Sequence, residues 1–277
     1  MSLFRNILLK SKQTYRKHVA RNSVDLGLFY ARGRDNIGDS MVPWLMREIL
    51  GHDVPYSNPR EANGRHLFTI GSILQYADQN SIVWGSGFVA DRSRPHGIPK
   101  VLAVRGPLSA ARLQQLGGKL AKVYGDPALL LPRYLAMPTI KQEFRIGLVP
   151  HYADAHKLAK TKVFKEDGVA ICDVRTSNVR EFVGSILRCG TIVSSSLHGI
   201  IIAEAFGVPA VWAKFDDDVA GSGFKFADYY GSTGRSVEPM SFYSLDSDVL
   251  GRQRPREPKA LDQMSGHLLE VLHGELS

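Results

Sequence analysis

Short apolar runs alternate with longer amphipathic stretches in the first half of the chain. Four of the runs have the length of buried strands: 25–31, 66–70, 82–84 and 101–104. Two stretches have the apolar spacing of helices, 41–51, which ends at Gly51, and 107–116, which begins at Pro107. Strands that alternate with helices predict a parallel sheet covered by its own helices.

The same alternation restarts after a linker that contains Pro132 and Pro138. The later strands are expected at 144–150, 169–174, 191–193 and 208–212. Helices are expected at 177–190, at 200–206 and, as a tail that packs on either half, at 261–273. The pattern therefore predicts an α/β protein of two Rossmann-like domains, 1–138 and 139–277, with a ligand cleft between them.

The composition of the chain indicates the cellular compartment and the kind of partner to expect. With 44% hydrophobic and 22% charged residues the chain is typical of a soluble globular protein, and its net charge of +8 predicts anionic partners. The basic segment 1–24 has no acidic residue and too short an apolar run to span a bilayer. It is either a helix packed on its own domain or a peripheral contact with the inner face of the plasma membrane. Cys172 and Cys189 lack metal-ligand spacing, so the expected compartment is the reducing cytoplasm.

The stretch TIVSSSLHGIIIAEAFGVPAV places His198 between a β-branched strand and an apolar helix. In a parallel α/β unit this elbow lies at the carboxyl end of the strand, and the first N–H groups of the helix point at whatever binds there. An anion is the expected ligand. The donors expected to contact it beside His198 are those of Ser194, Ser195 and Ser196 and the amides after Leu197, that of Gly199 among them.

Three further loops stand at predicted strand ends. Their candidate residues are Asn36, Gly38 and Asp39 in the first, Gly85, Ser86 and Gly87 in the second, and Arg105 in the third. Glycines allow close backbone approach, and an arginine can bind a carboxylate or phosphate with two hydrogen bonds. Each loop also has an ordinary structural interpretation: a helix cap, a tight turn and a structural salt bridge, respectively.

The order of NIGD, WGSGF, VRGPLS, YGDPALLLP, SSSLHGIIIAEAFGVPAV and KFADYYGSTG resembles that of the polysaccharide pyruvyl transferases of bacterial exopolysaccharide synthesis. The resemblance implies a fold similar to the GT-B glycosyltransferases. It also implies phosphoenolpyruvate as donor substrate and a sugar of a lipid-linked repeat unit as acceptor.

By position, the resemblance implies that Arg105, Leu197 and His198 contact phosphoenolpyruvate. Many members of the family carry arginine immediately before the Leu-His pair, where this chain has Ser196. The missing cation is then supplied by another basic residue, for which Arg32, Arg34 and Lys225 are candidates.

Ketal formation from phosphoenolpyruvate needs an acid, a base and an anion-binding site. His198 is expected to be the acid or else the phosphate-binding cation, and Asp39 the base. Asp228 is expected to orient the acceptor sugar, and Tyr229 or Tyr230 to stack on the apolar face of the sugar. Neither a metal nor a cofactor is expected, because no His, Cys, Asp or Glu cluster has ligand spacing.

Two rival functions remain open on the sequence alone. A nucleotide-sugar glycosyltransferase would use the same helix end for a diphosphate and an acidic residue such as Glu204 for the ribose. A basic module that binds glycan or nucleic acid is disfavoured because no basic groove interleaved with aromatic residues is present, so nucleic acid is not an expected partner.

Overall fold

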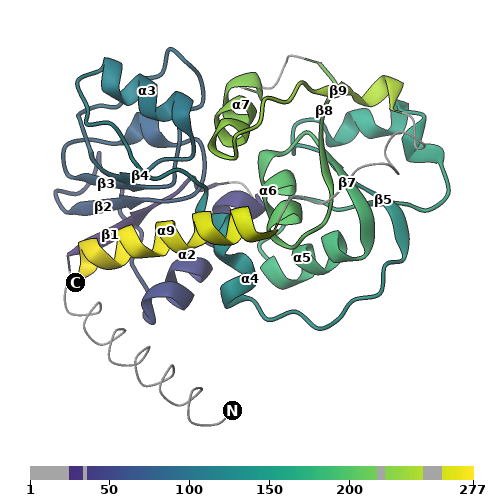
Figure 1. Cartoon of the computed structure of the whole chain (residues 1–277), viewed down its shortest axis with the longest axis horizontal. Coiled ribbons are helices and arrows are strands. Elements are labelled where there is room, and N and C mark those ends of the chain that lie inside the picture. The colour runs from purple at the N-terminus through teal and green to yellow at the C-terminus, as the bar shows by residue number, and fades with distance from the viewer. Residues whose placement is uncertain (1–24, 34–35, 217–221, 246–257) are drawn as a thin grey trace, which may run out of the picture.

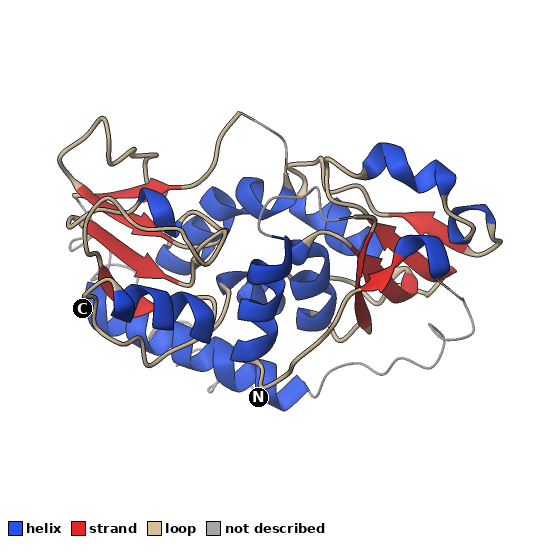
Figure 2. Ribbon diagram, turned by 90° about the horizontal axis from the view of Figure 1, so that it is seen from above, coloured by secondary structure: helices blue, strands red, loops and turns tan. Residues whose placement is uncertain are grey.

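The computed structural model describes residues 25–33, 36–216, 222–245 and 258–277. Two parallel sheets lie at opposite ends of an elongated molecule, with helices packed between them (Figures 1 and 2). The basic segment 1–24, with its expected membrane contact, and Arg34 lie outside the described residues. The expectation of parallel α/β architecture is confirmed, because every strand pair is parallel.

The first sheet has the strand order β1-β2-β3-β4. Its strands are β1 (Leu26–Phe29), β2 (Arg65–Phe68), β3 (Ser81–Trp84) and β4 (Lys100–Ala103). An isolated parallel bridge joins Leu28 to Tyr56, on the edge of β1 that faces away from β2. After β1 the chain first pairs with one edge of β1 at Tyr56 and then crosses to the opposite edge, where it forms β2. The strand order therefore reverses at β1. Such reversals are where open sheets bind ligands.

The second sheet has the strand order β6-β5-β7-β8-β9, which reverses between β5 and β7. Its strands are β5 (Phe144–Val149), β6 (Val169–Ile171), β7 (Cys189–Ser194), β8 (Ala210–Lys214) and β9 (Met240–Ser241). The last four residues of β5 and of β7 are buried, as expected for central strands covered on both faces.

The α-helices are α2 (Ile37–Leu50), α3 (Pro107–Gln115), α4 (Leu131–Tyr134), α5 (Val179–Leu187), α6 (Leu197–Ala205), α7 (Ser222–Ser232) and α9 (Pro258–Leu276). Short 3₁₀ turns are η1 (Leu74–Tyr76), η2 (Pro127–Leu130), η3 (Ala155–Lys160), η4 (Val163–Lys165) and η5 (Phe242–Ser244). Helix α2 begins at Ile37, before the expected start at 41, so Gly38 and Asp39 lie in its first turn. Helix α7 was not expected from the sequence.

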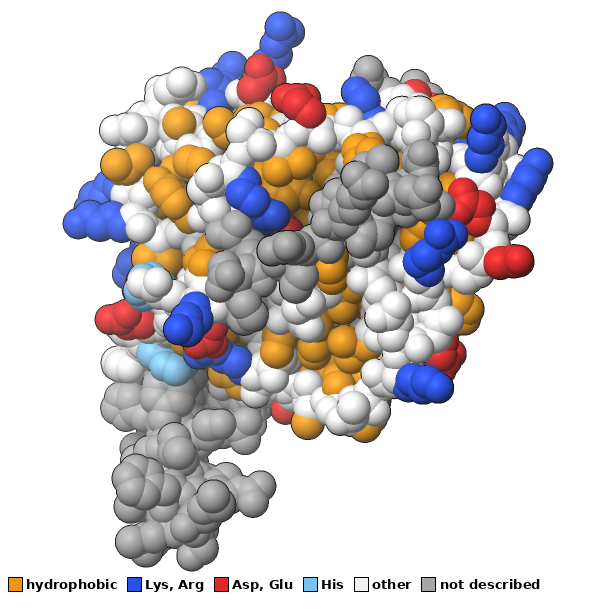
Figure 3. Space-filling view, turned by 45° about the vertical axis from the view of Figure 1, so that its right-hand side comes forward, with side chains coloured by type: hydrophobic (Ala, Val, Ile, Leu, Met, Phe, Trp, Pro, Cys, Tyr) orange, Lys and Arg blue, Asp and Glu red, His pale blue; other side chains and the backbone are white. Residues whose placement is uncertain are grey.

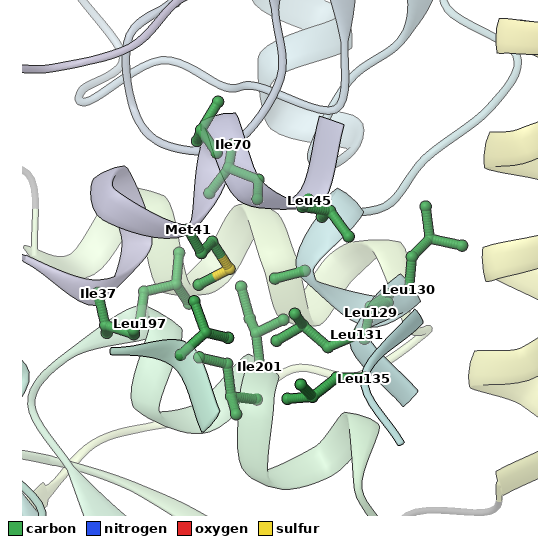
Figure 4. Packing of buried hydrophobic residues seen from close by; sticks show 14 of the residues in the cluster. Ile37, Met41, Leu45, Ile70, Leu129, Leu130, Leu131, Leu135, Leu197 and Ile201 are labelled. Atoms are coloured by element: carbon green, nitrogen blue, oxygen red, sulfur yellow. The ribbon is translucent and has the colours of Figure 1, made fainter. Parts of the chain in front are cut away.

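One apolar cluster joins the two halves. Ile37, Met41 and Leu45 of α2 face Leu197 and Ile201 of α6, and Leu129 to Leu131 of η2 and α4 pack beside them (Figure 4). Eight residues of α6, from Leu197 to Glu204, are buried, which agrees with its apolar sequence on all sides. The core between the sheets thus fixes the start of α6 against the start of α2.

The last helix returns to the first half. Helix α9 packs on β4 and η2, and the backbone oxygen of Leu268 accepts a hydrogen bond of 2.7 Å from the Trp84 indole. Glu275 forms ion pairs with Arg65 at 3.0 Å and with Lys100 at 2.6 Å. The expected second domain, 139–277, therefore does not account for α9, which lies with the first sheet (Figure 1). The chain crosses between the halves at 135–143, next to the expected boundary.

Among the described residues, the exposed large apolar side chains are Tyr76, Ile98, Leu108, Leu120, Ile171 and Tyr243. On the face shown in Figure 3, apolar side chains gather over the middle and charged side chains lie around the rim. None of the helices in the described ranges is both long enough and apolar enough to cross a membrane.

Candidate functional site

The serines at the end of β7 connect it to the end of β5. The Ser194 hydroxyl donates to the Val149 oxygen at 2.8 Å and accepts from the Ser196 amide at 3.0 Å. The Ser195 hydroxyl donates to Asp154 at 3.0 Å and accepts from the amide of His151 at 2.8 Å. These bonds place the start of α6 at the point where the strand order of the second sheet reverses.

Glycine at 199 permits this arrangement. A Cβ there would meet the Val149 side chain, at 2.6 Å, and the Ser194 hydroxyl. Gly199 therefore lets α6 approach β5 closely, while Leu197 points into the apolar cluster. Of the expected donor-binding residues, Ser195, Ser196, Leu197, His198 and Gly199 form this single turn, and all are buried.

His198 meets the first half of the molecule at Gly38. A Cβ on Gly38 would collide with the imidazole at Nδ1, so only glycine allows the start of α2 to lie against the ring. The neighbouring Asp39 receives a hydrogen bond of 2.9 Å from Asn36. Burial raises the pKa of Asp39, and the nearby His198 and the Asn36 hydrogen bond partly oppose this rise. The structure therefore brings the NIGD loop and the histidine elbow together.

A second carboxylate lies on the other edge of the imidazole. Nε2 of His198 is 3.8 Å from Oδ2 of Asp126, whose side chain is fully buried. Neither atom has a hydrogen-bond partner among the described residues. Buried polar atoms are nearly always paired in native proteins, so two unpaired atoms that face each other mark a place kept for chemistry or binding.

His151 and Lys225 lie near this turn. Burial lowers the pKa of His151 to about 4, with further contributions from the charges of Lys225 and His198. Burial also lowers the pKa of Lys225 to about 8, an effect that Arg105 increases and Asp154 opposes. Within the described parts of the chain no hydrogen bond or ion pair engages the Lys225 ammonium. His151 is thus neutral at pH 7, and Lys225 is a cation available to an anion.

Arg105 has a different environment from the one expected. Its side chain is fully buried, and its nitrogens donate to Asp228 at 3.0 Å, Ser72 at 2.6 Å and the Phe88 oxygen at 2.7 Å. A contact between Arg105 and phosphoenolpyruvate would require this network to open. The structure instead uses Arg105 to join the first half to α7.

Asp228 and Tyr229, expected at the acceptor, are also enclosed. Asp228 accepts from the Ser109 hydroxyl at 2.6 Å in addition to Arg105. The Tyr229 hydroxyl donates to Glu204 at 2.7 Å, and two nitrogens of Arg235 donate to the same carboxylate. Both side chains are buried. Asp228 connects the two halves through Arg105, and Tyr229 fixes α7 to α6 through Glu204.

The turn of Gly85, Ser86 and Gly87 packs against other buried groups. Gly85 has a φ of 99°, and a Cβ there would meet the Pro127 ring. A Cβ on Gly87 would meet the Arg105 guanidinium at 2.6 Å. The structure therefore supports the ordinary interpretation of this loop, as a tight turn that glycine allows, and it does not bring the loop to an exposed surface.

Sequence reasoning missed two residues of the site. His151 directly follows the strand expected at 144–150, so the strand-end criterion that selected the four loops also applies to it. Asp126 comes two residues after Tyr124, which pairs with Val104 in an isolated parallel bridge. In the described part of the chain, no group of three or more His, Cys, Asp or Glu side chains is arranged to hold a metal ion.

Comparison with known proteins supports one family. The sequence profile of the polysaccharide pyruvyl transferases matches residues 53–214. The chain belongs to this family. The match includes Arg105, Asp126, His151 and His198, while the NIGD loop and Lys225 lie outside it.

Two known proteins are similar to this chain at nearly equal sequence identity. The uncharacterized protein L143 of Acanthamoeba polyphaga mimivirus is 27% identical over 70% of this chain and 69% of its own length. The succinoglycan biosynthesis protein ExoV of Rhizobium meliloti (strain 1021) is 26% identical over 74% of this chain and 63% of its own length. Among solved structures, the uncharacterized protein KP1_0663 of Klebsiella pneumoniae subsp. pneumoniae NTUH-K2044 is 11% identical, with a TM-score of 0.43, over 82% of this chain and 94% of that chain.

Proposed function

We propose that the chain transfers pyruvate from phosphoenolpyruvate to a sugar of a bacterial exopolysaccharide, or of its lipid-linked repeat unit, as a ketal. Family membership and the similarity to ExoV support pyruvyl transfer in exopolysaccharide synthesis. The observation that carries the site assignment is the contact of His198, at the start of α6, with Gly38 of α2 beside the half-buried Asp39 and the buried Asp126.

The donor binds at the start of α6. Its phosphate and carboxylate accept hydrogen bonds from the Ser196 hydroxyl and from the first amides of the helix, whose positive dipole end favours an anion. The Ser195 hydroxyl joins them by exchanging its present bond to Asp154 for one to the donor. Lys225 supplies the cation that the serine at 196 does not. Arg32 is a weaker candidate because it is exposed and lies 4.5 Å from the centre of the Tyr56 ring.

A donor site built on Lys225 has a defined pH dependence. The pKa of Lys225 is lowered to about 8, so the side chain is charged below this pH and neutral above it. Donor affinity should therefore decrease as the pH rises through about 8, and Lys225→Met should remove this dependence together with most of the affinity. Lys225→Arg, which stays charged, should bind the donor at pH 9 better than the wild type does.

The reaction uses His198 as acid and Asp39 as base. His198 gives a proton to the methylene carbon of phosphoenolpyruvate, and positive charge develops at the carbon that carries the phosphate oxygen. Asp39, whose pKa is raised by burial, accepts the proton of the attacking sugar hydroxyl. A second hydroxyl of the same sugar then displaces phosphate and gives its proton to His198, which is thereby restored as the acid. Asp39 passes its proton to the departing phosphate, so one donor and one diol give one ketal and one hydrogen phosphate.

The acceptor occupies the side of the first half, next to Asn36, Gly38 and Asp39. In this proposal the two halves form a GT-B-like pair with the cleft between their points of strand reversal. The enzyme works in the cytoplasm, where phosphoenolpyruvate is available, and the basic segment 1–24 contacts anionic lipid beside a lipid-linked acceptor.

The nucleotide-sugar alternative lacks its ribose-binding residue. Both carboxylate oxygens of Glu204 are engaged by Tyr229 and Arg235, and the residue is 4% exposed. A hydrogen bond from Glu204 to a ribose would therefore cost at least one buried charge-assisted bond.

The direct test incubates the enzyme with phosphoenolpyruvate and extracted lipid-linked oligosaccharides. We expect a pyruvate ketal by mass analysis and an equal amount of released phosphate, both absent with His198→Gln and both retained with the exposed control His267→Gln. If UDP-sugars, but not phosphoenolpyruvate, raise the melting temperature of the protein, the proposed donor is wrong.

A further inference from the structure

Asp126 is held so that one of its oxygens faces His198. Its Oδ1 accepts a hydrogen bond of 2.9 Å from the Ala128 amide and so caps the turn η2. The following residue, Pro127, packs against Gly85 of the first sheet. These contacts fix the carboxylate, and its Oδ2 is left pointing at Nε2 of His198, 3.8 Å away.

The two facing atoms are buried without a partner among the described residues. Leaving a buried polar atom unpaired is destabilising, the more so when the group is charged. A separation of 3.8 Å exceeds a hydrogen bond by roughly 1 Å, a gap that a small rotation of the imidazole closes. Protonation of the ring would give Nε2 a hydrogen and turn the contact into a charge-assisted bond.

The opposite edge of the ring lies against Gly38. Nε2 is enclosed, so the exposed 11% of the His198 side chain lies on its remaining atoms. The imidazole thus has one buried nitrogen directed at a carboxylate and one nitrogen directed at the NIGD loop. In hydrolytic triads a buried carboxylate orients a catalytic histidine in a similar way, with the two ring nitrogens exchanged.

We infer that Asp126 is the positioning residue of His198: its carboxylate binds Nε2–H, stabilises the imidazolium and thereby leaves Nδ1–H to act on the donor. The titratable groups around the ring are Asp126 on the Nε2 side, Asp39 of α2, and His151 after β5. Asp126 is the one at which an unpaired oxygen meets an unpaired nitrogen. This role of Asp126 rests on the proposed function only in the experiment that measures turnover, and not in the titration of the imidazole.

The first experiment titrates the His198 ring by NMR in the full chain without substrate. Asp126→Asn keeps an oxygen to cap Ala128 and removes the charge, so the midpoint of the imidazole titration should fall by about 1–3 pH units. The matched control Asp262→Asn removes a charge from an exposed ion pair with Arg133 and should leave the midpoint unchanged. An unchanged midpoint in Asp126→Asn overturns the inference.

The second experiment measures the reaction. Asp126→Asn should lower turnover by about 10²- to 10⁴-fold and move the acidic limb of the pH profile, with little change in the KM for the donor. Equal losses in turnover and donor affinity at all pH values, without a change in the profile, would show a purely structural role and overturn the inference. If Asp126→Asn does not fold, the carboxyl titration of Asp126 is followed in His198→Gln, where loss of the imidazolium should move it to higher pH. No difference there contradicts the inference.

The two proposals fail in different ways. If no pyruvyl transfer is found but Asp126→Asn shifts the imidazole titration, the positioning contact stands and the proposed reaction is wrong. If transfer is found and the titration does not shift, the reaction stands and the role of Asp126 is wrong.

Discussion

Two buried carboxylates lie where the halves of the molecule meet, and they differ in how completely they are paired. Asp228 accepts from Arg105 and from both the amide and the hydroxyl of Ser109, so every group in that cluster has a partner. Asp126 has one paired oxygen and one that faces unpaired Nε2 of His198. The first arrangement is typical of a structural connection and the second of a functional site.

The difference also bears on the choice of Arg105 as the expected anion-binding cation. An arginine at the end of a strand can bind an anion, but the same position lets it reach a carboxylate from the other half, and a fully satisfied buried pair has no donor left over. Lys225 lies on the same helix as Asp228 and is without an ion-pair partner among the described residues. The two cations therefore differ in pairing: Arg105 is fully engaged by buried acceptors, and Lys225 keeps the capacity to pair with an anion.

The largest effect should come from His198→Gln. Glutamine keeps a hydrogen-bond donor but cannot deliver a proton, so turnover should fall by about 10²- to 10⁴-fold while donor affinity and the free energy of unfolding change little. Steady-state kinetics, donor calorimetry and urea unfolding measure the three quantities. A collapse of donor affinity would make His198 a binding cation, and no effect at all would make it structural.

Arg105→Met should have the opposite effect, with a large loss in the free energy of unfolding. It leaves Asp228 buried and charged without its main partner, which should lower the free energy of unfolding by about 3–5 kcal/mol. The control Arg133→Met breaks an exposed pair with Asp262 and should cost less than about 1 kcal/mol. Urea unfolding compares them. If Arg105→Met folds as stably as the wild type and loses only donor affinity, the comparison between the two carboxylates fails.

Gly38→Ala tests the contact between the halves at the site. The added methyl group would overlap the His198 imidazole, so we expect a loss of stability of about 1–3 kcal/mol and reduced turnover. Gly274→Ala in α9 meets nothing within 4 Å and should be neutral or stabilising by about 0.5–1 kcal/mol. An active, stable Gly38→Ala enzyme would mean that the start of α2 does not lie on the imidazole.

The smallest effect concerns pH and His151. Because its folded pKa of about 4 is lower than its ordinary value of 6.5, the unfolded chain binds more protons between these values. The free energy of unfolding should therefore decrease as the pH falls from about 6.5 to about 4, and His151→Gln should reduce this slope. Urea unfolding at several pH values measures it, and an equal slope in both proteins would contradict the neutral state of His151.

Local signals in the sequence were sufficient for most of the elements and for part of the site. The start of α3 at Pro107 and the end of α2 at Gly51 follow from rules that act within a few residues. Helix α7 was not predicted because polar residues interrupt the apolar positions Phe226, Tyr229 and Tyr230, and because the sequence before it has no clear N-cap. In addition, Gly221 and Gly223 favour a loop where the helix begins.

What the sequence alone determined is the alternation of buried strands and helices, and with it the placement of His198 at the end of a strand and the start of a helix. Those features depend on the period of apolar residues and on turn chemistry, which neighbouring residues specify. Only the tertiary structure decided that His198 meets Gly38 and Asp126, that Arg105 pairs with Asp228, and that α9 returns to the first sheet. These contacts depend on strand order and on how the core between the sheets is filled, and neither is encoded in the period of any one segment.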